Sequence, residues 1–263
     1  MTTFAAAIAA AIAAALAAAS ESAGSSSACV TASAEHNKLL SSLPPVPCRE
    51  DLARVAETYF RTRELSRAAE IGVWRGTFAA ANLRIWGGEY FAIDAWRHRS
   101  EDARKGYTDK NERDQSRHDT NFAIARRNML RVDPHERRFR MLRNLSFEAA
   151  TLFPDHHFDW LYVDALHTYE AVLGDLEAWW PKLRPGGLIS GDDYGDMKDV
   201  NETYVTGQRW QNQFKFNFPF GSGTAWGVIR ALREFSRRKC VQLHITWMND
   251  CYPIPAWYMI KPS

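Results

Sequence analysis

The segment Phe158–Asp196 constrains the fold more than any other part of the chain, because its pattern changes from strand to helix and back to strand. Residues 158–163 (FDWLYV) are apolar and aromatic, which is typical of a buried strand. We expect a helix over Tyr169–Leu183, which Pro185-Gly186-Gly187 would end before a second strand starts at Leu188. This order predicts two neighbouring parallel strands in an α/β sheet.

Acidic side chains stand at the ends of both predicted strands. Asp164 closes the first strand, His167 follows three positions later, and Asp192-Asp193 close the second strand. In an open parallel sheet, ligands bind outside the carboxyl ends of the strands. We therefore expect three carboxylates and a histidine to meet in one cleft, where they would serve chemistry and not the core.

A second block, Arg67–Gly76 (RAAEIGVWRG), reads as a short strand followed by a glycine-containing turn, and a helix is expected over Thr77–Trp86. Glycines let a ligand approach the backbone, and a helix N-terminus carries a partial positive charge. The acidic-x-Gly-x-x-x-Gly pattern fits the dinucleotide fingerprint poorly. The next predicted strand, Glu89–Ile93, ends at Asp94, where an acidic residue can take two ribose hydroxyls.

In this order and spacing, the chain resembles the class I S-adenosylmethionine-dependent methyltransferases, and it is most similar to the small-molecule O-methyltransferases of the catechol and macrocin types. The resemblance covers residues 51–262 and includes Asn144-Leu145-Ser146, which matches the segment that borders the adenine. It implies an α/β, Rossmann-like open sheet of mostly parallel strands, with a C-terminal antiparallel hairpin and helices on both faces.

The resemblance also implies the residues of the site. S-adenosylmethionine would be bound by nine residues: Glu70, Gly72, Trp74, Gly76, Asp94, Ala95, Trp96, Ser146 and Asp164. A divalent metal such as Mg²⁺ would be held by Asp164, Asp192 and Asp193, whose oxygens suit hard cations. The alternative is that these aspartates only cap the helix and turn that follow them.

The catalytic residues expected from the sequence are Asp164 and His167. Catechol-type enzymes carry a lysine a few residues after the strand-four aspartate, whereas this chain reads Asp-Ala-Leu-His-Thr-Tyr. His167 would then act as the general base near neutral pH, in place of that lysine. The alternative is a hydrogen-bonded histidine at the start of a helix.

Composition divides the chain into a leader and linker (1–47) and one α/β domain (48–263), which the resemblance implies is a methyltransferase domain. Phe4–Ala19 contains only Ala, Ile, Leu and Phe, is shorter than the roughly 20 residues of a membrane span, and resembles a signal-peptide core. We expect a secretory or organellar location if this leader is functional, and a cytoplasmic one otherwise. The Ser/Ala-rich stretch Ser20–Ala34 is expected to be a disordered linker.

Charge and cysteine spacing exclude two classes of site. A net charge of +2 without a basic run gives no support for nucleic-acid binding. The four cysteines have no C-x-x-C spacing, which argues against zinc and leaves either free thiols or a Cys240–Cys251 pair. The long polar stretch 97–117 is expected to be a substrate-covering lid or a solvated insertion, with Tyr107, Gln115 and His118 as contacts.

The function predicted is methylation of a hydroxyl on a small molecule, a sugar or a phenol. One alternative is a metal-dependent glycosyltransferase anchored in the secretory pathway, which would use the acidic run at 192–196. Another is a non-catalytic binding protein on a methyltransferase fold. A nicotinamide-dependent oxidoreductase is disfavoured because the third glycine of its motif is missing. The expected partner is a small-molecule acceptor, and homo-oligomerisation is left open.

Overall fold

The computed structural model describes residues 43–61, 65–98, 114–197, 226–246 and 254–263. The predicted leader and linker (1–47) lie outside these ranges except for residues 43–47, and Tyr107 lies outside them as well. Within the described ranges, every helix is too short or too polar to cross a membrane.

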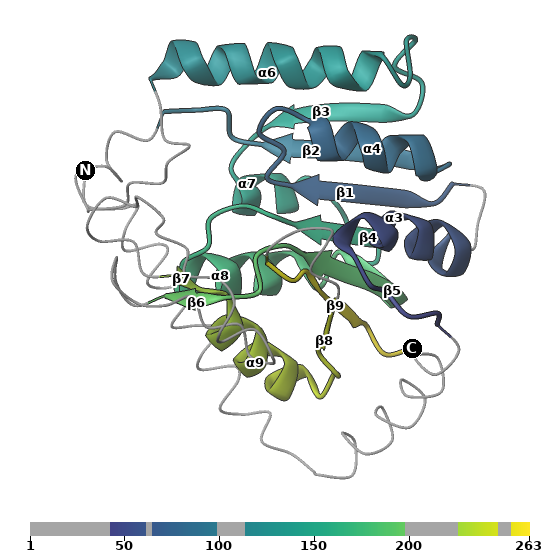
Figure 1. Ribbon diagram of the computed structural model, residues 1–263, viewed down its shortest axis with the longest axis vertical. Helices are drawn as coiled ribbons and strands as arrows, with labels where there is room; N and C mark the ends of the chain where they lie inside the picture. The colour runs from purple at the N-terminus through teal and green to yellow at the C-terminus, as the bar shows by residue number, and fades with distance from the viewer. Residues whose placement is uncertain (1–42, 62–64, 99–113, 198–225, 247–253) are drawn as a thin grey trace.

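A seven-stranded sheet forms the centre of the molecule (Figure 1), in the order β3-β2-β1-β4-β5-β9-β8. Five strands run parallel, while β9 is antiparallel to both β5 and β8. A separate two-stranded ladder joins β6 and β7. The strands are β1 Arg67–Ile71, β2 Glu89–Asp94, β3 Phe139–Arg143, β4 Phe158–Val163, β5 Leu183–Gly191, β6 Asp196–Met197, β7 Trp226–Gly227, β8 His244–Ile245 and β9 Trp257–Ile260. This confirms the predicted Rossmann-like sheet and its antiparallel C-terminal pair.

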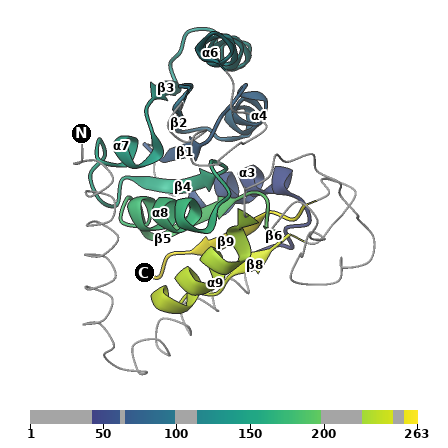
Figure 2. The same ribbon diagram turned by 90° about the vertical axis from the view of Figure 1, so that its left-hand side faces the viewer.

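Helices cover both faces of the sheet, as predicted (Figure 2). One apolar cluster joins the sheet to the N-terminal helical segment, α4 and α6, and the other joins it to α7, α8 and α9. The N-terminal segment consists of η1 Arg49–Asp51, α3 Leu52–Val55 and the π-helical turn η2 Ala56–Phe60. The remaining helices are α4 Thr77–Ile85, α6 Gln115–Leu130, α7 Ser146–Ala150, α8 Tyr169–Trp179 and α9 Val228–Lys239.

Strand β4 lies at the middle of the sheet, and all six of its residues are buried. Its side chains alternate between the two faces: Trp160 and Tyr162 belong to one apolar cluster, and Leu161 and Val163 to the other. A strand covered on both faces reads as a continuous apolar run, which is why its position could be predicted from the sequence.

Two predicted boundaries are wrong for identifiable reasons. Helix α8 ends at Trp179, and β5 starts at Leu183, so the Pro-Gly-Gly run lies inside a strand. The pairing shifts from Phe158↔Leu183 to Trp160↔Leu188, and this bulge accommodates the extra residues. Helix α6 starts at Gln115, inside the stretch 97–117 that was expected to be a lid or an insertion, because the Asp114 side chain caps it by accepting the Arg117 N–H.

The structure contradicts the alternative of free thiols for two of the four cysteines. Cys48 and Cys240 are both disulfide-bonded. The other two cysteines, Cys29 and Cys251, lie outside the described residues.

Candidate active site

The turn after β1 is built against the backbone of β4. Gly72 has a φ of +93°, and a Cβ at this position would lie 1.9 Å from the Asp164 carbonyl oxygen. The Asp164 N–H in turn donates to the Ile71 carbonyl at 2.7 Å. The glycine is therefore required by the neighbouring strand, whereas the sequence had suggested only that it leaves room for a ligand. Gly76 has a φ of +67°, and a Cβ added there would lie 2.9 Å from the Ala125 Cα of α6.

Asp94 joins the end of β2 to this turn. Its Oδ2 accepts hydrogen bonds from the Val73 and Trp74 N–H groups at 2.9 and 2.8 Å. Its Oδ1 accepts the Trp96 N–H at 2.8 Å, and the Trp96 indole donates to the Trp74 carbonyl at 2.7 Å. Trp96 is buried, whereas the Trp74 side chain is 48% exposed above the turn. Asp94 thus holds the turn in a fixed shape and remains accessible at the sheet edge.

Glu70 lies beneath the turn in the core. Its carboxylate accepts hydrogen bonds from the Tyr90 hydroxyl at 2.6 Å and from Asn82 Nδ2 at 3.2 Å. Burial raises the pKa of Glu70 to about 8, although these hydrogen bonds lower it. In this structure the carboxylate supports the turn from inside, and its contact with a cofactor stays a prediction.

A cavity of about 260 Å³ opens beside Asp94, at the carboxyl ends of β2 and β3. Ala95 and Gln115, which the sequence singled out, line this cavity, whereas Ser146 does not and accepts the Trp179 indole N–H at 2.8 Å. Sequence reasoning missed Arg143, the last residue of β3, although its place at a strand end was a usable signal. The cavity lining comprises Ala95, Arg97, Gln115, Arg143, Asn144, Leu145 and Glu148.

An aspartate–histidine cluster, Asp164, His167 and Asp193, lies at the ends of the neighbouring strands β4 and β5. His167 Nε2 is 3.3 Å from Asp164 Oδ1 and 3.3 Å from Asp193 Oδ2. One donor atom from each of the three residues lies within 4.8 Å of the others. The predicted convergence of these residues is therefore observed. Their roles as base, ligand or cap stay predictions.

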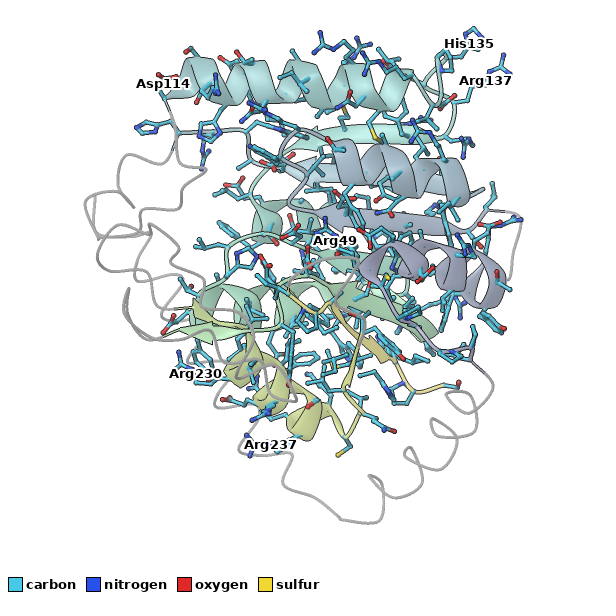
Figure 3. The ribbon with its side chains drawn as sticks, viewed as in Figure 1. Arg49, Asp114, His135, Arg137, Arg230 and Arg237 are labelled. Carbon is cyan, nitrogen blue, oxygen red and sulfur yellow. The ribbon has the colours of Figure 1, made fainter. Side chains whose placement is uncertain are left out.

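Asp192 is placed differently from the other two aspartates. Its side chain is buried and forms an ion pair with Arg49. Arg49, which Figure 3 labels, belongs to the N-terminal segment. Burial raises the pKa of the Asp192 carboxyl well above its usual range, and Asp193 and Asp164 raise it further, while Arg49 opposes them. Sequence reasoning missed Arg49 because nothing local marks a contact between residues so far apart in the chain.

The chemistry of this edge fits a divalent cation. Two carboxylates and an imidazole are grouped there, and the buried Asp192 lies near enough for Asp164 and Asp193 to act on its charge. Like charges held this close oppose one another unless a cation or a proton compensates them. Asp164, His167 and Asp193 are the residues that could hold such a cation together.

The structure brings the three features that carried the resemblance to the same edge of the sheet: the glycine turn, the acidic residue at the end of β2 and the carboxylates after β4 and β5. Residues 69–194 match the family model described as a methyltransferase domain, and we assign this part of the chain to that family. The prediction of a methyltransferase domain is thereby confirmed for residues 69–194.

Solved structures of similar fold include two O-methyltransferases. The enzyme from Bacillus cereus, in complex with S-adenosylhomocysteine, is 16% identical, with 91% of this chain and 93% of that chain covered and a TM-score of 0.47. TomG from Streptomyces achromogenes, in complex with S-adenosylmethionine, is 14% identical, with 91% and 92% covered and a TM-score of 0.46. The comparison with curated proteins found no match. The assignment of this chain therefore rests on the domain family and on its own site.

Proposed function

We propose that the protein transfers the methyl group of S-adenosylmethionine to a hydroxyl of a small molecule, a phenol or a sugar. One observation carries this proposal: the cavity beside Asp94 and the aspartate–histidine cluster lie at the same edge of the sheet, on either side of the glycine turn. A cofactor that extended from the cavity across the turn would end next to the cluster. Methyl transfer to an acceptor bound at the cluster requires this closeness of the cofactor's methyl group to the acceptor.

Each part of this edge has a distinct role in the proposal. The cavity would receive the nucleoside end of the cofactor, and Asp94 would bind its ribose, as the acidic residue after a second strand does in related nucleotide sites. S-adenosylmethionine would supply an electrophilic methyl group, and a divalent cation, if held at the cluster by Asp164, His167 and Asp193, would supply a Lewis acid for the acceptor hydroxyl. Asp164 and Asp193 would orient the acceptor side of the site.

The proposal is tested first by cofactor binding. We expect isothermal titration calorimetry to show S-adenosylhomocysteine binding to the wild type, and Asp94→Asn to weaken that binding by about tenfold or more, because a charged ribose contact is lost. Asp155→Asn is the matched control, since Asp155 is an exposed aspartate that pairs with Lys182 away from the site. Absence of binding to the wild type at millimolar ligand would refute the proposed function.

The second test is methyl transfer itself. Labelled S-adenosylmethionine would be incubated with a panel of phenols and sugars, with and without EDTA, and methylated products detected by mass spectrometry. A hydroxyl acceptor and loss of activity in EDTA are the expected results. Cofactor binding without transfer to any acceptor would instead favour the alternative of a non-catalytic binding protein.

A further inference from the structure

We propose that the protein docks on an anionic phospholipid membrane through the amino edge of its sheet, the edge where the parallel strands begin. The contact is made by an arginine face, which comprises the exposed residues Arg84, Arg127, Arg131, Arg137 and Arg140. Arg137, labelled in Figure 3, marks the position of this face beyond the end of α6. The glycine turn and the carboxylates lie at the opposite edge of the sheet, so the inference goes beyond the proposed function and does not depend on it.

The arginine face is assembled from three elements: the last turn of α4, the end of α6, and the turn that leads into β3. The Arg138 guanidinium joins them, because it donates to the Leu83 and Trp86 carbonyls at the end of α4, at 3.1 and 2.7 Å. The Arg138 N–H donates to the buried Asp133 side chain at 2.7 Å and thereby fixes the turn after α6. The fold therefore holds the arginines in one place.

The positive charge of the arginine face is not neutralised by neighbouring carboxylates. Within the described ranges, none of the five arginines forms an ion pair with an acidic side chain. The acidic residues of the turn are engaged elsewhere, since Glu136 pairs with Arg126 and Asp133 is buried against the backbone. Because the whole chain carries only +2, the rest of it is net negative. The two signs of charge are thus separated, with Asp94 and Asp164 at the opposite edge.

Exposed apolar side chains lie at the same amino edge. Leu65, just before β1, is 64% exposed, and Tyr59 of η2 is 38% exposed. Segment 87–89, which joins α4 to β2, connects them to the arginine face, because it donates hydrogen bonds to the Ser66 carbonyl at 3.0 Å and to the Glu57 side chain at 2.9 Å. At a membrane interface, apolar side chains enter the acyl boundary while cations stay at the head groups. This edge presents both kinds of group.

The composition of the edge selects lipid over other polyanions. Arginine suits phosphate in general, because its planar fork of donors binds two oxygens at once. Single-stranded nucleic acid needs aromatic platforms for its bases, whereas the exposed rings of Trp74 and Phe147 lie at the carboxyl ends of the strands. Duplex nucleic acid would engage the arginines but leave Leu65 in water. An anionic membrane engages both.

The sequence before the described domain suits the same surface. The apolar run Phe4–Ala19 is shorter than the roughly 20 residues of a membrane span. A modest apolar anchor alone binds a bilayer reversibly, and stable attachment takes a second signal such as a polybasic surface. The arginine face supplies this second signal. A molecule docked by its amino edge turns the candidate active site away from the lipid, so the acceptor can reach it from water.

The test measures partition of the full-length protein into vesicles by co-sedimentation. Vesicles of phosphatidylcholine alone would be compared with vesicles that contain about 30% phosphatidylserine, at about 0.1 M and about 0.5 M NaCl. We expect partition into the anionic vesicles to be at least about tenfold stronger at the lower salt, and most of this difference to disappear at the higher salt. Free glycerophosphoserine at millimolar concentration should not compete, because one head group engages only part of the face.

Matched variants locate the docking surface. Arg131→Gln combined with Arg137→Gln should lower partition into anionic vesicles by about fivefold for each charge removed, whereas the two lysine substitutions should keep most of it. The control is Arg233→Gln combined with Arg237→Gln, which removes the same charge from the exposed side of α9, where Figure 3 labels Arg237. Leu65→Ser should weaken binding to both kinds of vesicle, because it removes an apolar contact and no charge.

Four results would overturn the inference. They are equal partition into the two kinds of vesicle at low salt, equal losses in the α9 control and in the double variant of the arginine face, full competition by glycerophosphoserine, and tighter binding of a short RNA duplex than of anionic vesicles. The third result would assign the arginines to a small anion, and the fourth would assign them to nucleic acid.

Discussion

At the scale of single residues, the site is held by polar side chains that are themselves buried. Glu70, Asn82 and Tyr90 form a hydrogen-bonded group under the glycine turn, and each is at most 2% exposed. The sequence predicted that Glu70 matters but placed it against the ligand, because a motif gives the position of a residue and not the direction of its side chain. Its partner Tyr90, on the next strand, could not be identified from spacing alone.

The buried carboxyl of Glu70 predicts a pH dependence of stability. Burial raises its pKa from 4.5 to about 8 in the folded protein, so the folded state keeps a proton that the unfolded state loses. Stability should therefore fall as the pH rises from about 4.5 to about 8, with a slope of up to about 1.4 kcal/mol per pH unit from this group. Urea unfolding of the wild type and of Glu70→Gln between pH 5 and pH 9 would measure the difference.

Glu70→Gln carries no titrating proton, so its stability should depend less on pH over this window. The matched control is Glu57→Gln, whose carboxylate pairs with Arg61 nearer the surface, and which should retain the slope of the wild type. Parallel curves for Glu70→Gln and the wild type would show that Glu70 is ionised in the folded protein.

At the scale of elements, local patterns predicted the strands better than their connections. The bounds of β4 agree with the sequence prediction, because a short apolar run between polar turns is a local signal. The start of β5 could not be predicted, since Pro185, Gly186 and Gly187 enter the strand only through a bulge opposite β4. Pairing between strands decides that boundary, and pairing is not encoded in a single segment.

The contact between the glycine turn and β4 predicts that replacing Gly72 and replacing Gly174 by alanine will change the stability of the protein very differently. Gly72→Ala would place a methyl group against the Asp164 backbone and force a residue with a side chain to adopt a positive φ. We expect a loss of at least about 3 kcal/mol in the free energy of unfolding, from strain and displacement of β4. Gly174 lies on the exposed face of α8, and a Cβ added there would have no neighbouring side chain or other segment within 4 Å. Gly174→Ala should therefore stabilise the protein by about 0.5–1 kcal/mol.

Chemical denaturation of both variants beside the wild type would test this pair. Equal effects of the two substitutions would contradict the assignment of Gly72 to strand packing. If the Gly72→Ala protein folds, titration with S-adenosylhomocysteine would show whether the altered turn also loses the ability to bind the cofactor.

At the scale of the whole molecule, the segment before the family domain is part of the site. The family match begins at residue 69, yet Val46 is buried in the core, Leu43 packs against the same apolar cluster, and Arg49 reaches Asp192 beyond β5. The sequence predicted a domain from residue 48 and predicted Asp192, but not the pairing of the two regions. Such a contact depends on the completed fold, because the two side chains are brought together only when α3 packs on the sheet.

The ion pair between Arg49 and Asp192 predicts how firmly this segment is bound to the domain. The Arg49 side chain is 21% exposed and that of Asp192 is 3% exposed, so Arg49→Met would leave a buried carboxylate without its partner. We expect a loss of about 3–5 kcal/mol in the free energy of unfolding at neutral pH. Adding Asp192→Asn should restore much of the lost stability, because the charge that needed Arg49 is then absent.

Arg54→Met is the control. Arg54 pairs with Asp51 at 3.7 Å and its side chain is 71% exposed, so the free energy of unfolding should change by no more than about 1 kcal/mol. Thermal and urea unfolding of the four proteins would decide the matter, and an Arg49→Met protein as stable as Arg54→Met would show that the N-terminal segment is held by its apolar contacts alone.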